Sequence, residues 1–267
     1  MKSLSGKTAI VTGAASGIGR SCAGAMAERG IRVVAVDISE EPLKALAADV
    51  MANGGEILPL AIDIGIENSF DVIRARAMDV FGPVDILMNN VGVLISGKPE
   101  DIPLTEWQRV INLNLMATIR AVHLFIPEMI ARGEGHIVNT ASFAGLFPYA
   151  WDRLPYAAAK AAVIALSEGL ALYLKPQGIG VTCLCPGPVR TNIGATRKVW
   201  TEGMAPRGPG SQFRMMEPEE VAAQVIEAIE RDVFFLPTDD QVLERMQARA
   251  RDPEAFLTEQ IAAMQAD

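Results

Sequence analysis

Short apolar runs alternate along this chain with longer amphipathic stretches, and the alternation predicts strands followed by helices. The first run, residues 7–11, leads through a glycine-rich turn into helix-forming residues that end at Arg29. The second run, residues 31–36, is almost continuously apolar and β-branched, as expected of a strand that is buried on both faces. Strands that alternate with helices predict a parallel, doubly wound sheet. We therefore expect one α/β domain over residues 1–267, with about seven strands and helices on both faces.

The same alternation continues to the end of the chain. It predicts helices near residues 40–53, 68–81, 105–132, 157–174 and 218–231, and strands near 57–62, 84–88, 136–140, 178–185 and 233–236. One or two further helices follow at the C-terminus, and a capping pattern opens the helix at Thr105. Residues 192–216 contain four glycines, two prolines and several large apolar side chains. This composition is typical of a mobile substrate lid.

Composition and charge limit the classes of partner. The chain has 267 residues, 50% of them hydrophobic, and a formal net charge of -8. Because it has no run of Lys or Arg, it is poorly suited to bind nucleic acid. No uninterrupted apolar run reaches the roughly 18 residues of a membrane span, and the first strand pattern begins at Lys7. We expect a soluble, cytoplasmic protein with no membrane partner.

The cysteines and histidines favour neither a disulfide framework nor a metal site. Cys183 and Cys185 alternate on one expected strand, and Cys22 lies in the first helix, so we expect core thiols. His123 and His136 lie near no serine or cysteine elbow, which counts against a hydrolase triad and a histidine-rich metal site.

The first glycine turn has the sequence context of a dinucleotide site, because a strand, the turn and a helix follow one another in order. Gly13 can take a tight turn, and Gly17 lets the backbone approach a pyrophosphate at the helix N-terminus. Gly19 lets the helix pack closely on the sheet. Ser16 and Ile18 complete the expected cofactor loop. Glycine turns also serve as plain connections, so the interpretation depends on the strands that follow.

Polar residues at the carboxyl ends of the next strands support a nucleotide. A carboxylate at Asp37 can accept both hydroxyls of an adenosine ribose and repels a 2′-phosphate, so NAD is favoured over NADP. Asp63, followed by Ile64, can accept a hydrogen bond from the adenine amino group. Asn90 and Gly92 are expected to line the adenosine side of the crevice. The alternative for Asp37 is a surface turn residue with no ligand role. The alternative for Asn90 and Gly92 is an Asn-rich turn that binds no ligand.

One pair of ionisable side chains is set in place by spacing alone. Tyr156 and Lys160 follow Pro155 at the start of a helix, so they lie one turn apart on the same face. A nearby cation and the positive end of a helix both favour phenolate, which predicts a lowered tyrosine pKa. Ser142 comes just after the strand at 136–140, and its hydroxyl can share a substrate oxygen with Tyr156. The alternatives are a chance Tyr–Lys spacing and a serine that only caps a turn.

In combination these motifs resemble the short-chain dehydrogenase/reductase family, over nearly the whole chain and in a highly specific order. They are residues 12–19, residues 89–92, Asn114, Ser142, Tyr156 with Lys160, and residues 186–191. The resemblance implies a Rossmann-like fold with Tyr156 as general acid/base. It implies that Lys160 lowers the tyrosine pKa and holds the nicotinamide ribose, that Ser142 positions the substrate oxygen, and that Asn114 supports a proton-relay water.

The loop at 186–191 is expected to be rigid because of its prolines. By the resemblance, Val189 and Thr191 hold the carboxamide of nicotinamide, with Pro186 and Gly187 in the same cofactor-binding loop.

Two positions depart from the family pattern. Val91 stands where the family usually has alanine, and the interval from Ser142 to Tyr156 is one residue longer than expected. The loop in this interval is therefore expected to shape the pocket differently. Tyr149 and Arg153 within it mimic the Tyr–Lys spacing, but prolines on either side disfavour a continuous helix there.

The leading hypothesis is an NAD(H)-dependent oxidoreductase that interconverts a secondary alcohol and a ketone, with Tyr156 transferring the proton. A second hypothesis is a non-catalytic nucleotide-sensing or scaffold protein on the same fold. A methyltransferase interpretation leaves Tyr156 and Lys160 unexplained. The apolar lid favours a bulky, uncharged or aromatic alcohol. Because the helix at 157–174 is apolar nearly all round, we also expect a homodimer or homotetramer.

Overall fold

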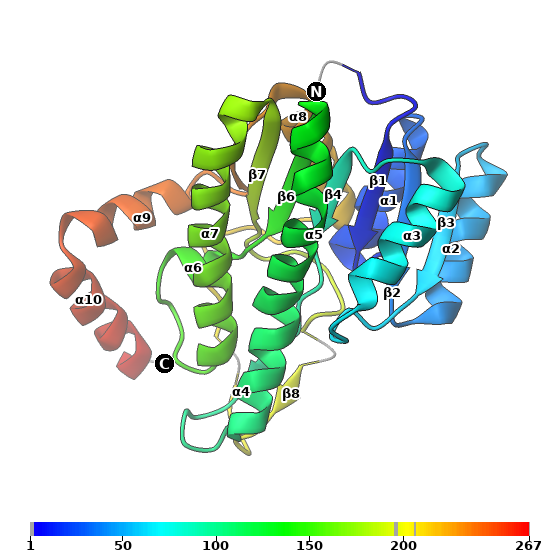
Figure 1. The fold of residues 1–267 in the computed structure, drawn as a ribbon. Helices are drawn as coiled ribbons and strands as arrows, with labels where there is room; N and C mark the ends of the chain where they lie inside the picture. The colour runs from blue at the N-terminus through cyan, green and yellow to red at the C-terminus, as the bar shows by residue number, and fades with distance from the viewer. Residues whose placement is uncertain (1–2, 195–196, 206, 267) are drawn as a thin grey trace.

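The computed structural model describes residues 3–194, 197–205 and 207–266, and its centre is a seven-stranded parallel sheet (Figure 1). The strand order is β3-β2-β1-β4-β6-β7-β9. The strands are β1 (Thr8–Thr12), β2 (Arg32–Asp37), β3 (Ile57–Ala61), β4 (Ile86–Asn89), β6 (Gly135–Thr140), β7 (Ile179–Cys185) and β9 (Phe235–Pro237). The order reverses between β1 and β4, and ligands of such sheets bind at the carboxyl ends of the strands beside that point. The predicted fold class is confirmed.

Helices cover both faces of the sheet (Figure 1). Helices α1 (Gly17–Glu28), α2 (Glu40–Ala52) and α8 (Pro218–Arg231) enclose one apolar core. Helices α3 (Ser69–Phe81), α5 (Ala117–Arg132) and α7 (Leu154–Leu174) enclose the other. In α1, Ala23, Met26 and Ala27 recur at helical spacing and are buried, which is why this segment packs as an amphipathic helix. The three cysteines are buried free thiols, as predicted.

The helix predicted at 105–132 is divided into three parts. Helix α4 (Leu104–Ile111) leads into a π-helical turn, η1 (Asn112–Met116), and then into α5. The prediction that Thr105 opens the helix with a cap was wrong, because the N-cap is Pro103 and no side chain bonds the first turn. Proline fixes the backbone φ there, so the extended loop ends and the helix begins without a polar cap.

The predicted lid at 192–216 is less irregular than its composition suggests, although residues 195, 196 and 206 lie outside the described part of the chain. A short strand, β8 (Lys198–Val199), pairs in parallel with β5 (Ile95–Ser96). Phe213 and Met216 are only 5% and 1% exposed, so the prediction of a mobile lid was wrong for these two residues, which are packed in the protein. Phe213 packs edge-on against Phe143, with 5.0 Å between ring centroids.

Two further helices, α9 (Val242–Arg251) and α10 (Pro253–Ala266), follow β9 and lie at the edge of the molecule beside the short helix α6 (Phe143–Leu146) (Figure 1). Phe256 anchors α10 against Phe147. By length and composition alone, Leu104–Arg132 and Leu154–Gln177 would each be able to cross a membrane. One face of each packs against the sheet, and 39% and 28% of the two apolar windows are buried in this chain.

Candidate active site

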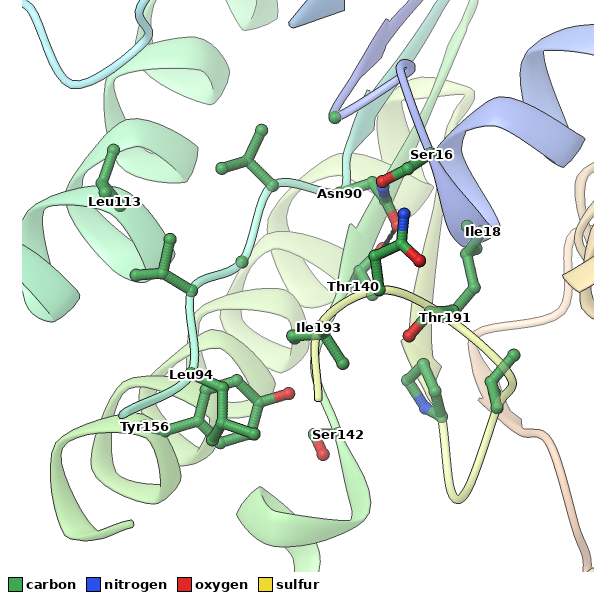
Figure 2. A pocket seen from close by; sticks show the side chains of 18 of the residues that line it. Ser16, Ile18, Asn90, Leu94, Leu113, Thr140, Ser142, Tyr156, Thr191 and Ile193 are labelled. Atoms are coloured by element: carbon green, nitrogen blue, oxygen red, sulfur yellow. Dashed lines mark hydrogen bonds between the residues drawn. The ribbon is translucent and has the colours of Figure 1, made fainter. Parts of the chain in front are cut away.

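A cavity of about 1350 Å³ lies at the carboxyl ends of the central strands (Figure 2). A single-ligand pocket is typically roughly 300–1000 Å³, so this cavity has room for a dinucleotide and a second small molecule. Of the predicted site residues, Gly19 and Asn114 do not line it. All the others do: Gly13, Ser16, Gly17, Ile18, Asp37, Asp63, Ile64, Asn90, Gly92, Ser142, Tyr156, Lys160, Pro186, Gly187, Val189 and Thr191.

The glycine turn between β1 and α1 forms one wall of the cavity. Gly13 has φ +69°, a conformation that favours glycine. A Cβ on Gly19 would lie 2.1 Å from the Gly13 carbonyl oxygen and 2.6 Å from the Asn90 amide nitrogen. Gly19 is therefore required by contact with the turn itself and with the end of β4. No side chain caps α1, so its first N–H groups remain available to an anion, and the turn fits a pyrophosphate.

The carboxylate of Asp37 is held at this wall by two backbone groups. The N–H groups of Ala15 and Ser39 donate to its two oxygens at 3.1 and 3.0 Å. Each carboxylate oxygen keeps a further lone pair for a ribose hydroxyl. Asp63 is exposed and accepts from the Gly65 N–H at 2.8 Å.

Asn90 and Gly92 lie in different parts of the cavity. The Asn90 side-chain amide donates to the Thr12 carbonyl at 3.2 Å, which ties the end of β4 to the end of β1. A Cβ on Gly92 would lie 3.4 Å from the Lys160 Nζ. Gly92, two residues beyond Asn90, thus lies beside Lys160 of α7, and its expected place on the adenosine side stays a prediction.

Tyr156 and Lys160 are buried one turn apart in α7, as their spacing predicted. The Lys160 ammonium donates to the Thr140 carbonyl at 2.6 Å and lies 5.7 Å from the centre of the Tyr156 ring. Ser142 accepts a hydrogen bond from the Ala144 N–H at 3.2 Å, so it caps α6 and also lines the cavity. Figure 2 shows Ser142 and Tyr156 at one end of the cavity and Ser16 and Ile18 at the other.

The electrostatic prediction for Tyr156 was wrong for this structure. Burial raises the pKa of Tyr156, and a hydrogen bond with Ser142 and the charge of Arg153 only partly oppose this. Burial also lowers the pKa of Lys160 to about 8. Desolvation disfavours the charged form of each group, and Lys160 directs its ammonium at a backbone carbonyl and not at the phenol. The pair is therefore held in a site that penalises charge on either member.

Asn114 lies within η1 and is buried beneath the cavity. Its side chain accepts from the Val93 N–H at 2.8 Å and donates to the Val93 carbonyl at 3.0 Å. It therefore fixes the backbone that follows β4 beside Lys160. A π-helical turn inserts one extra residue into a helix, and such turns are frequent at functional sites.

The loop at 186–191 is rigid for reasons beyond its prolines. Val189 forms a β-bridge with Met216, and the Met216 N–H donates to the Pro188 carbonyl at 3.0 Å. A Cβ on Gly17 would lie 2.9 Å from the Thr191 methyl carbon. Glycine at position 17 thus lets this loop approach the phosphate-binding turn.

Sequence reasoning missed a buried ion pair beside Tyr156. Arg153 donates to both oxygens of Asp152, at 2.6 and 3.0 Å, and to the carbonyl of Arg207. Its guanidinium lies 5.5 Å from the Tyr149 ring centre, and burial raises the pKa of Tyr149 to about 12. Residues 149 and 153 form no helical pair, as the flanking prolines indicated. The sequence signal that could have predicted this ion pair is the adjacency of Asp152 and Arg153, two opposite charges in an otherwise apolar loop.

Comparison with known proteins relates the chain to one group of enzymes. Residues 7–202 match the family model described as short chain dehydrogenase. The chain is 36% identical over 225 residues to an NAD-dependent glycerol dehydrogenase of Listeria innocua, covering 82% of this chain and 85% of that protein. A short chain dehydrogenase/reductase from Burkholderia phymatum in complex with NAD is 30% identical, with a TM-score of 0.84 over 96% of both chains. A metagenomic short-chain oxidoreductase in complex with NADP is 29% identical, with a TM-score of 0.71 over 87% of this chain and 95% of that one.

Proposed function

Because this chain belongs to the short-chain dehydrogenase/reductase family, we propose that it is an NAD(H)-dependent oxidoreductase that interconverts a secondary alcohol and a ketone. The observation that carries the proposal is the buried Tyr156 beside Lys160 and Ser142, in one cavity with the glycine turn. A nicotinamide cofactor, when bound, supplies the hydride chemistry. The remaining work, which is to hold the substrate oxygen and move its proton, falls to this chain's own side chains.

Tyr156 is the proton donor in ketone reduction and, as phenolate, the proton acceptor in alcohol oxidation. The Ser142 hydroxyl holds the same substrate oxygen. Lys160 binds the ribose next to the nicotinamide, and Asn114 positions the backbone beside Lys160 through its two hydrogen bonds to Val93. The raised pKa of Tyr156 suits it as a donor for reduction, because the phenol then keeps its proton at neutral pH.

We assign NAD in preference to NADP on account of Asp37. A carboxylate beside the adenosine ribose accepts its hydroxyls and is unfavourable beside a 2′-phosphate. The next residue is Ile38, which is 69% exposed, so the position that follows Asp37 offers no cation to a phosphate.

The substrate is bulky and apolar or aromatic over most of its length. The apolar side chains that line the cavity together with Tyr156 include Leu94, Leu113, Tyr149, Ile193 and Met215, and Figure 2 labels Leu94, Leu113 and Ile193 among them. Such walls favour apolar surface on a ligand.

The test is the absorbance of reduced nicotinamide during incubation with a panel of secondary alcohols and ketones. Turnover of any member, dependent on NAD or NADH, supports the enzyme. Tight NADH binding with no turnover of any member would instead favour a nucleotide-sensing protein on the same fold.

A further inference from the structure

Four arginines line the cavity, and three of them already have a carboxylate partner. These three, Arg109, Arg153 and Arg190, are paired with Glu106 at 2.9 Å, Asp152 at 2.6 Å and Glu217 at 2.8 Å. Their charges are balanced within the protein, so none of them requires a ligand.

Arg197, the fourth, makes no hydrogen bond or ion pair with any residue that the structure describes, and its Nε is buried without a partner. A buried donor that lacks an acceptor costs free energy, and a charged one costs more. Native proteins keep few such groups, and each calls for an explanation, such as a functional role or a bound water or ion.

The strand pairing places Arg197 at the substrate end of the cavity. Lys198 is aligned with Ile95 in the parallel β5–β8 pair, so the same register sets Arg197 beside Leu94. Leu94 and Tyr156 line the same cavity, and Figure 2 draws both at the end of it where Ser142 lies. The two carboxylates that line the cavity, Asp37 and Asp63, belong to the ends of β2 and β3 on the glycine-turn side. Arg197 therefore lines the cavity at the end away from Asp37 and Asp63, where no carboxylate among the described residues lines the wall.

We propose that Arg197 binds a carboxylate of the substrate, so that the alcohol or ketone carries an apolar or aromatic body and one acidic group. This inference rests on the proposed function and adds a charge to its substrate class. A planar guanidinium matches a carboxylate with two parallel hydrogen bonds, and exclusion of water by the apolar walls strengthens the pair. The contact would orient the substrate with its acidic group toward β8 and its reacting oxygen toward Tyr156 and Ser142.

The experiment compares two ligands of equal ring size and different charge. Benzoate and benzamide are titrated calorimetrically into the protein saturated with NADH, which measures recognition without turnover. One charge-assisted contact predicts that benzoate binds roughly tenfold to a hundredfold more tightly than benzamide. Arg197→Gln should remove most of this preference, and Arg197→Lys should restore part of it because the charge is retained. Arg109→Gln removes a paired guanidinium from the same cavity and should leave the preference intact.

Several results would overturn the proposal. They are equal affinity for the two ligands, no binding of benzoate at millimolar concentration, or a preference that survives Arg197→Gln with an unchanged melting temperature. Loss of NADH affinity in Arg197→Gln, without loss of the benzoate preference, would assign the residue to the cofactor diphosphate instead. The alcohol panel tests the proposed function by turnover and the benzoate preference is measured by binding, so the two can fail separately.

Discussion

At the scale of single residues, the chemistry of the site depends on the burial of Tyr156 and Lys160, which share the cavity with Ser142. Motif order and helical spacing suffice to bring Tyr156, Lys160 and Ser142 together. Burial depends on how α7 packs on the sheet, and that determines the sign of a pKa shift. Sequence reasoning counted the nearby cation and the helix end, whereas desolvation prevails for both Tyr156 and Lys160.

Tyr156→Phe should reduce turnover by about 10²- to 10⁴-fold, the usual contribution of a general acid or base. The ring still packs in α7, so NADH binding measured by fluorescence titration should be unchanged. In the wild type, alcohol oxidation should accelerate as pH rises, because the base is the phenolate. Near-normal turnover of the variant with a good substrate would contradict this role.

Lys160 should make the stability of the cofactor-free protein depend on pH. Its pKa is lowered from 10.5 to about 8 in the folded chain, so between these values the unfolded chain binds more protons and stability rises with pH. The shift corresponds to roughly 3 kcal/mol. Denaturant unfolding of the wild type and of Lys160→Met at pH 7.5 and 10.5 isolates this contribution. From pH 7.5 to 10.5, we expect the unfolding free energy of the wild type to rise by about that amount relative to Lys160→Met. A difference in unfolding free energy that is the same at both pH values would refute the lowered pKa of Lys160.

Asp37 should control the choice between NAD and NADP. The wild type should bind NADH more tightly than NADPH, because its carboxylate is unfavourable beside a 2′-phosphate. Asp37→Ala should narrow the difference in fluorescence titrations of the two cofactors. Equal or tighter NADPH binding by the wild type would contradict the assignment.

At the scale of elements, periodicity located the main strands and helices and failed where pairing is short or distant. The two-residue strands β5 and β8 lie about a hundred residues apart in sequence and carry no pattern of their own. The π-helical turn η1 is equally hidden, because its residues continue an apolar helical stretch. Asn114, a polar residue inside that stretch, was the one visible sign of a special backbone.

The segment at 192–216 should respond to ligands only in part. Within residues 197–205 regular pairing is confined to β8 and the adjoining Trp200, and Arg197 lines the cavity. Their amides should therefore exchange fast and slow down in a ternary complex. The region of Phe213 and Met216 is already packed in the core and should be protected throughout. Hydrogen exchange followed by mass spectrometry would test this, with β6 as a protected reference. Equal protection of residues 197–205 with and without ligands would argue against closure.

At the scale of the whole molecule, the sheet could be predicted because its strands are continuous apolar runs that only a two-sided cover can bury. Burial against the sheet does not account for the whole apolar surface of α7. Its sequence is apolar nearly all round, yet only 28% of its most apolar 18-residue window is buried in this chain. Leu172 and Tyr173 are 82% and 60% exposed.

A second copy of this chain is the cover we expect for α7. Burying one large apolar side chain is worth about 2 kcal/mol, so a helix face of this composition favours a homodimer or homotetramer built on α7, and on the adjacent α4 and α5. Light scattering at micromolar concentration should give twice or four times the chain mass. Leu172→Arg should shift the distribution toward monomer. Met51→Arg, on α2 across the sheet and 56% exposed in the wild type, should not, because it removes a similar apolar side chain from the opposite face. A wild-type monomer, or equal effects of the two variants, would show that the exposed face of α7 does not mediate assembly.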